Sequence, residues 1–236
     1  MVIGMSNLQA QEKQIAVSSF DNVVISPHIE VTFVEGNREM LTIEDSDVPL
    51  EKINVKVDGK TLKLYLDGAK DYTKSKKVKT DEYKGRQQLY HGTKVTATVS
   101  YKHLNKLIVK GEEMIRLNSP LQQNDFDLTV YGESDVLVKS ADLENLKVVM
   151  YGESYLKFDE GEVDYQKYKT YGESEVNALN LSTRSAKVTA FGESELMLNV
   201  SERLKVTSYG ESEINYKGSP SIDKGVVLGE NSISKL

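Results

Sequence analysis

The chain has 236 residues, 39% of them hydrophobic, and a formal net charge of −6, which argues against nucleic acid as a partner because such proteins carry a basic face. The absence of cysteine excludes a disulfide framework, a thiolate metal site, a cysteine nucleophile and a lipid-anchored cysteine within this sequence. No stretch approaches the roughly 18 apolar residues of a membrane-spanning helix.

Residues 1–14 are expected to lie outside the folded domain. They are mildly apolar and then polar, and the Leu8-Gln9-Ala10 step resembles the small-residue end of a secretory signal that lacks its basic start. We expect a residual export signal or a disordered N-terminus, followed by one domain over residues 15–236.

The first part of that domain, residues 15–101, is predicted to be made of strands. Alternating or β-branched runs cover residues 23–25, 29–34, 41–43, 53–57, 62–66 and 95–101. Asp58-Gly59 lies between two of these runs and is a strong hairpin signal.

Residues 70–88 interrupt this pattern. The segment is dense in lysine, and its few apolar residues have no period. We expect a solvated excursion; the alternative is a docking patch for an anionic surface.

Residues 102–236 repeat an aromatic residue followed by Gly-Glu-Ser. The five full copies begin at Tyr131, Tyr151, Tyr171, Phe191 and Tyr209. Looser copies stand at Lys110–Glu113 and Leu228–Asn231, and successive glycines are 21, 20, 20, 20, 18 and 19 residues apart. A period of this length is typical of a solenoid, in which each unit packs against its neighbours.

The apolar residues keep a constant position relative to each glycine. The residue four positions later is always aliphatic: Ile115, Val136, Leu156, Val176, Leu196, Ile214 and Ile233. Alternation on both sides of the glycine indicates two half-buried strands joined at a bend. The sequence therefore predicts an all-β, single-stranded, right-handed parallel β-helix with coils of about 20 residues, which the N-terminal strands continue or cap.

Stacked coils place equivalent residues in columns at the strand spacing of about 4.8 Å. The serines of the motif fall on the inward phase, and the aromatic residues should stack. Two further columns are charged. Glutamate follows every glycine, and lysine stands five residues before most of them, at Lys106, Lys147, Lys167, Lys187, Lys205 and Lys224.

The aromatic and glutamate columns are the candidate ligand-binding face. Their residues are Tyr131, Glu133, Tyr151, Glu153, Tyr171, Glu173, Phe191, Glu193, Tyr209 and Glu211. Like charges at strand spacing repel unless something offsets them. Three interpretations remain open. The carboxylates extend into water or accept hydrogen bonds from corner amides, they share cations between coils, or they recognise a ligand such as a glycan. We predict no dedicated metal site and no cofactor.

An enzyme is the less favoured interpretation. β-Helices also carry polysaccharide-active enzymes, but a catalytic carboxylate pair needs two different environments, whereas these glutamates repeat on equivalent corners. His28, His91 and His103 form no recognisable triad or metal spacing, and each is expected at the surface or an edge. We therefore predict no catalytic residues.

The opening segment Phe20–Gly36 and the later segment Ile53–Tyr65 resemble the putative auto-transporter adhesin, head GIN domain family. The resemblance covers roughly residues 17–235. Members usually repeat a Ser-Gly-Ala/Ser-Ser corner where this chain has Tyr-Gly-Glu-Ser. The resemblance implies a β-helical domain that is common in exported proteins of Bacteroidetes-like bacteria and has no established activity.

Together these features predict an exported, non-enzymatic binding or adhesion module with a glycan or protein ligand, located in the periplasm, at the cell surface or outside the cell. The alternative is a structural or assembly domain of an envelope complex. The last coil is atypical, because Asn231 replaces the inward serine and Lys235 an inward apolar residue. We expect that coil to be frayed or paired with a second copy as a homodimer through this end.

Overall fold

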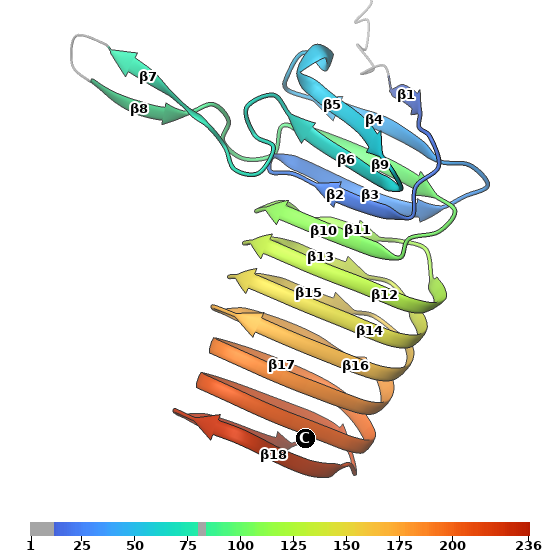
Figure 1. Cartoon of the computed structure of the whole chain (residues 1–236), viewed down its shortest axis with the longest axis vertical. Coiled ribbons are helices and arrows are strands. Elements are labelled where there is room, and N and C mark those ends of the chain that lie inside the picture. Colours follow the sequence, from blue (N-terminus) through green and yellow to red (C-terminus); the bar gives the residue numbers. More distant parts are fainter. Residues whose placement is uncertain (1–11, 80–83) are drawn as a thin grey trace, which may run out of the picture.

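The computed structural model describes residues 12–79 and 84–236, which form a right-handed parallel β-helix of about six turns (Figure 1). The described residues contain strands and a single short 3-10 turn, η1 (Leu50–Lys52), with no α-helix. The predicted fold class is therefore confirmed.

Each regular coil contains a long segment that ends at the corner glycine or one residue before it and a short segment that follows, and in β17 these segments join into one strand. These strands are β10 (Lys106–Gly111), β11 (Ile115–Leu117), β12 (Leu121–Gly132), β13 (Asp135–Val138), β14 (Ala141–Gly152), β15 (Tyr155–Phe158), β16 (Gly161–Tyr171), β17 (Ser174–Gly218), β18 (Ser221–Leu228) and β19 (Asn231–Lys235). Strand β17 is continuous for 45 residues because its pairing continues around the corners. Each strand pairs in parallel with its equivalent one coil further on.

The core runs along the inside of the coils. The aliphatic residues four positions after the glycines are at most 1% exposed in six consecutive coils: Ile115, Val136, Leu156, Val176, Leu196 and Ile214. Ile233, in the last coil, is only partly buried because it has a neighbouring coil on one side alone. The predicted inward register is confirmed.

Stacking also dictates the residues at the corner. Gly132, Gly152 and Gly172 have φ between +109° and +112°, a region that side chains with a Cβ resist. A Cβ at Gly152 would overlap the carbonyl oxygen of Gly132 on the preceding coil. The serine two positions later is buried, and Ser154 donates a 2.9 Å hydrogen bond to that same carbonyl. Glycine and serine thus close the corner together.

The N-terminal strands form the upper coils in an order that the repeat did not reveal. They are β1 (Lys13–Ala16), β2 (Asn22–Ile25), β3 (Ile29–Glu35), β4 (Met40–Ser46), β5 (Ile53–Asp58), β6 (Thr61–Leu66) and β9 (Val95–Tyr101). Strand β2 lies between β6 and β10, and β3 lies between β9 and β11, all in parallel. Strands β4 and β5 then cover β9 and β6 in antiparallel pairs, so this segment both continues and caps the solenoid.

The lysine-rich excursion is more regular than expected. Strands β7 (Ser75–Lys79) and β8 (Lys84–Gln88) form a separate antiparallel hairpin that projects away from the solenoid (Figure 1). Residues 80–83 between them lie outside the described part of the chain, as do residues 1–11 of the expected N-terminal segment.

The last coil corrects the predicted lysine column. The pairing of β17 with β18 shifts between Val206 and Ser208, so Lys224 lies opposite Val206. Asp223 lies opposite Lys205 instead, with its Oδ2 3.4 Å from the lysine Nζ. One additional residue in β18 accounts for the shift.

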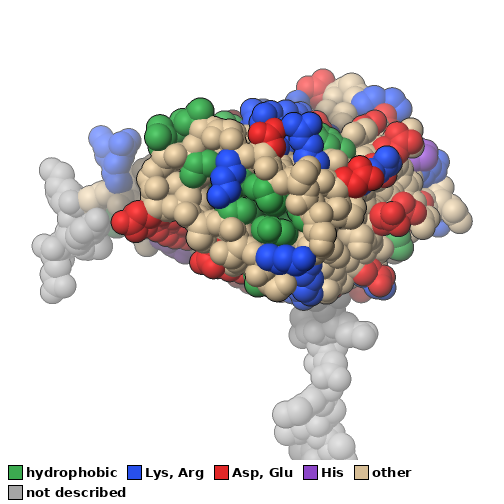
Figure 2. All heavy atoms as spheres, turned by 90° about the horizontal axis from the view of Figure 1, so that it is seen from below, with side chains coloured by type: hydrophobic (Ala, Val, Ile, Leu, Met, Phe, Trp, Pro, Cys, Tyr) green, Lys and Arg blue, Asp and Glu red, His purple; other side chains and the backbone are tan. Residues whose placement is uncertain are grey.

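Strands β18 and β19 pair with β17, and within the described residues their outer edges have no strand partner. Figure 2 views this end and shows hydrophobic side chains near its centre. Val226 and Leu228 on β18 are 50% and 59% exposed. Pairing of this end with a second copy stays a prediction.

Candidate binding surface and a cavity at its upper end

The predicted aromatic column forms. Tyr131, Tyr151, Tyr171, Phe191 and Tyr209 stack in sequence, with ring centroids 4.8–5.0 Å apart and ring planes within 6° of parallel. Tyr131 is 42% exposed and Tyr151 and Tyr209 are 37% exposed, whereas Tyr171 and Phe191 are half-buried.

This geometry decides which parts of the rings a ligand can reach. In a stack of parallel rings each inner ring has both faces covered, so it offers only its edge to solvent, together with its hydroxyl group where the ring is a tyrosine. Tyr131 and Tyr209 are the exceptions, because each has a ring neighbour on one side. A sugar ring lying flat on successive aromatic faces is therefore incompatible with the inner part of the column.

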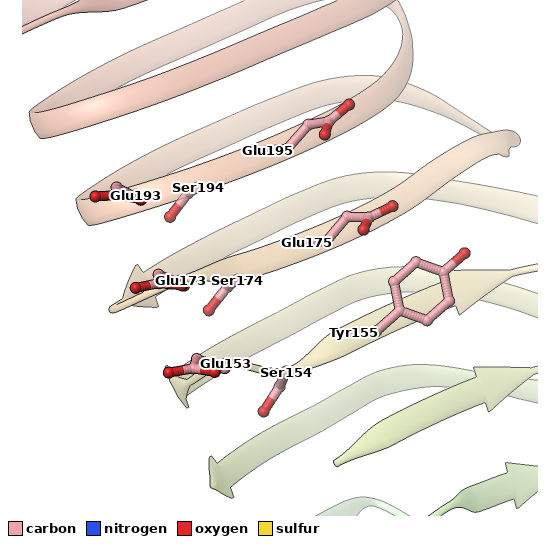
Figure 3. Close-up of a pocket in the computed structure, with 9 residues that line it drawn as sticks. All are labelled: Glu153, Ser154, Tyr155, Glu173, Ser174, Glu175, Glu193, Ser194 and Glu195. Atoms are coloured by element: carbon pink, nitrogen blue, oxygen red, sulfur yellow. The ribbon is translucent and has the colours of Figure 1, made fainter. Parts of the chain in front are cut away.

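The glutamate column runs beside the rings and has a second acidic column next to it. Glu175, Glu195 and Glu213 stand two residues after the first-column glutamates, and alternate residues of a strand point to the same side. Figure 3 shows the first column on three successive coils and the second on two of them, at Glu175 and Glu195, with Tyr155 at that position of the third coil and the inward serines between the columns. They line a shallow hollow of about 390 Å³ with Tyr155. Sequence reasoning missed the second column, although its spacing was visible in the Gly-Glu-Ser-Glu copies.

We call eight carboxylates of these columns, those of the full Gly-Glu-Ser copies, the acidic face: Glu133, Glu153, Glu173, Glu193, Glu211, Glu175, Glu195 and Glu213. All eight residues are exposed. Within residues 12–79 and 84–236, none of these carboxylates has a lysine or arginine nitrogen within 4.0 Å. No three His, Asp or Glu side chains in this part of the chain are arranged to hold a metal ion.

Repulsion on the acidic face is evident at its centre. Partial burial raises the pKa of the Glu195 carboxyl above its ordinary value, and the neighbouring charges of Glu175 and Glu213 raise it further. The ionised form of Glu195 is therefore less stable in the folded chain than in water.

Replacement of Glu195 by Gln should raise the free energy of unfolding at pH 7 by a few tenths of a kcal/mol, about the size of one exposed like-charge contact. Because the folded pKa is raised, the ionised carboxylate destabilises the fold at neutral pH, and this penalty disappears once acid protonates the group in both states. Thermal melts of both proteins at pH 7 and near pH 4 test the sign. A variant less stable at pH 7 would instead reveal a favourable contact of the carboxylate.

A deeper cavity lies at the upper end of the aromatic column, where the excursion leaves the solenoid. Its volume is about 400 Å³, and its lining includes Tyr131, Glu112, Glu113 and Lys110 from the solenoid and Asp71 from the excursion. The Lys110 Nζ is 2.6 Å from Asp71 Oδ1, and this contact holds the pKa of the Asp71 carboxyl below its ordinary value.

His28 corrects the expectation that each histidine lies at the surface or an edge. His28 is 8% exposed and has φ +73°, and the ring nitrogen Nδ1 donates a 2.8 Å hydrogen bond to the Gly92 carbonyl. Its Nε2 lies 2.6 Å from the Thr73 hydroxyl. The ring thus ties both ends of the excursion to the solenoid.

Glu113 occupies the inward position that serine takes in later coils. It is 7% exposed, and its Oε2 accepts a 3.0 Å hydrogen bond from the Glu112 amide. The other oxygen, Oε1, is 3.7 Å from His28 Nδ1, which is beyond hydrogen-bond distance. The signal for this pair in the sequence was the missing serine in the first corner.

The comparisons with known proteins agree with the fold. The model of the putative auto-transporter adhesin, head GIN domain family matches residues 19–220. The chain belongs to this family. No curated protein matches the chain.

Solved structures similar to this family member extend over nearly the whole chain. A putative adhesin from Bacteroides fragilis NCTC 9343 is 22% identical with a TM-score of 0.78, covering 95% of this chain and 96% of its own. A putative adhesin from Parabacteroides merdae ATCC 43184 is 16% identical, with a TM-score of 0.70 and coverage of 98% and 97%. A putative lipid binding protein from Parabacteroides distasonis ATCC 8503 is 19% identical, with a TM-score of 0.65 and coverage of 98% of both chains.

Among the described residues, no helix is both long and apolar enough to span a membrane.

Proposed function

We propose that the chain is an exported binding module that holds a cationic segment of a protein ligand against its acidic face. The observation that carries the proposal is the pair of unneutralised carboxylate columns on neighbouring coils. Export and a surface role are supported by the family description, which names an adhesin.

The form of the surface favours a basic protein segment over a neutral glycan lying along the column. Inner ring faces are covered by their neighbours, so the stacking area that a neutral sugar needs is absent there. Exposed carboxylates and tyrosine hydroxyls at the ring edges accept hydrogen bonds from lysine and arginine. A bound cation would also relieve the repulsion around Glu195.

The proposal is for a module without catalysis. The carboxylates of the acidic face repeat on equivalent, exposed corners, and the charges that raise the pKa of Glu195 belong to carboxylates at the same position of the adjacent coils. A rigid solenoid that presents the same group once per coil is suited to multivalent binding, in which several weak contacts act together.

Binding of a fluorescent oligolysine peptide to the full chain tests the proposal. A variant that combines Glu173→Gln, Glu175→Gln and Glu193→Gln should bind about tenfold more weakly, since three exposed ion pairs of about 0.5 kcal/mol each add up to about 1.5 kcal/mol. Affinity for the unaltered chain should fall steeply as salt rises, because exposed charges are screened.

The matched control carries Asp142→Asn, Glu144→Gln and Glu162→Gln on other exposed positions of the coils, which removes the same total charge. The control should keep most of the affinity. Equal losses in the two variants would reduce the effect to net charge and contradict a defined binding face. Absence of binding at low salt would favour the role as a structural or assembly domain.

A further inference from the structure

We propose that the cavity at the upper end of the aromatic column is a second binding site, which takes the terminal residue of a non-acidic saccharide. It adjoins the acidic face, because Glu112 is the first glutamate of that column, but it takes a different ligand. At about 400 Å³ it can hold one or two sugar rings, and it is within the usual range for small-ligand sites.

Tyr131 supplies the stacking platform. It is the first ring of the column, so Tyr151 covers one of its faces and no ring covers the other. The residue in register with it on the preceding coil is Lys110, whose Nζ lies 2.6 Å from Asp71 Oδ1. Tyr131 is the most exposed of the column's tyrosines and lines the cavity. The apolar C–H face of a pyranose packs on an open aromatic face of this kind.

The polar lining matches hydroxyl donors. Glu113 uses one carboxylate oxygen on the Glu112 amide, which leaves Oε1 as an acceptor inside the cavity on a residue that is 93% buried. Glu112 adds a second carboxylate, whereas the Asp71 charge is offset by Lys110. This excess of negative charge would repel sialic and uronic acids, so neutral and amino sugars are the ligands that fit.

The cavity is held in shape before any ligand arrives. His28 is the one non-glycine residue with positive φ in the described chain, and its ring fixes Thr73 and Gly92 at the two ends of the excursion. The bond from Lys110 to Asp71 fixes the wall beside Tyr131. A wall fixed in advance lowers the ordering cost of binding.

A saccharide array with neutral, amino and acidic terminal residues, probed with the full chain, tests the site. We expect binding to a subset of neutral or amino termini and none to acidic ones. Tyr131→Ala should weaken that binding at least tenfold, and Glu113→Gln should weaken it severalfold while keeping the acceptor for the Glu112 amide.

Tyr209→Ala is the matched control, because Tyr209 also ends the column and also has a single ring neighbour. It should leave array binding unchanged, as should the Gln triple variant of the acidic face. Equal losses from Tyr131→Ala and Tyr209→Ala, a preference for acidic termini, or no binding to any terminus would each overturn the proposal. Failure of the oligolysine assay would not affect it.

Discussion

Replacement of Gly152 by Ala should lower the free energy of unfolding by at least about 3 kcal/mol, the upper end for one strained backbone position. Gly152 has φ +109°, and a Cβ there would overlap the carbonyl oxygen of Gly132. That carbonyl accepts hydrogen bonds from Glu153 N and Ser154 Oγ, so it cannot move without loosening the next corner. Denaturant unfolding of the two proteins measures the loss.

Gly59→Ala is the control for backbone strain alone. Gly59 lies in the β5–β6 turn with φ +59°, and a Cβ there would meet nothing within 4 Å. The expected loss is about 1–2 kcal/mol, the cost of a left-handed residue. A Gly152→Ala loss no larger than that of Gly59→Ala would show that the stacked corner tolerates a methyl group, contrary to the geometry described above.

Replacement of Leu156 by Ala should cost about 2–5 kcal/mol, the range for large-to-small changes in a core. Leu156 is fully buried, and it is paired in register with Val136 above and Val176 below. Because the coil spacing is fixed by backbone hydrogen bonds on both sides, the cavity cannot collapse. Thermal and denaturant unfolding would measure the effect.

Leu137→Ala is the matched control in the neighbouring coil. Leu137 points outward and is half-buried, so its loss should be about 1 kcal/mol or less. Comparable losses at Leu156 and Leu137 would place the core on the wrong face of the strands.

The regular coils could be predicted because every repeat has the same spacing between its corner glycine and its inward aliphatic residue. Each glycine identifies a corner, and the aliphatic residue four positions later identifies the inward phase. The proximity of Glu113 and His28 could not be predicted in this way. Glu113 breaks the repeat once, and its partner lies 85 residues earlier in a turn that has no repeat of its own.

The order of the strands in the upper coils could not be predicted from the sequence for a related reason. Strand β2 pairs with β6 and β10, so coils that are adjacent in space are distant along the chain. Alternation identifies a strand but not its neighbours. Lys224 likewise was misplaced because a single additional residue in β18 shifts the register, and counting from the glycine does not reveal where that residue is inserted.

Amide hydrogen exchange of the full chain with and without oligolysine tests the role of the acidic face most directly. Added peptide should slow exchange at the corners over residues 151–156, 171–176, 191–196 and 209–214, and should leave exchange in the outward strands around Asp142 and Glu162 unchanged. Slower exchange confined to those other strands, or spread evenly over the solenoid, would contradict a ligand held on the acidic face.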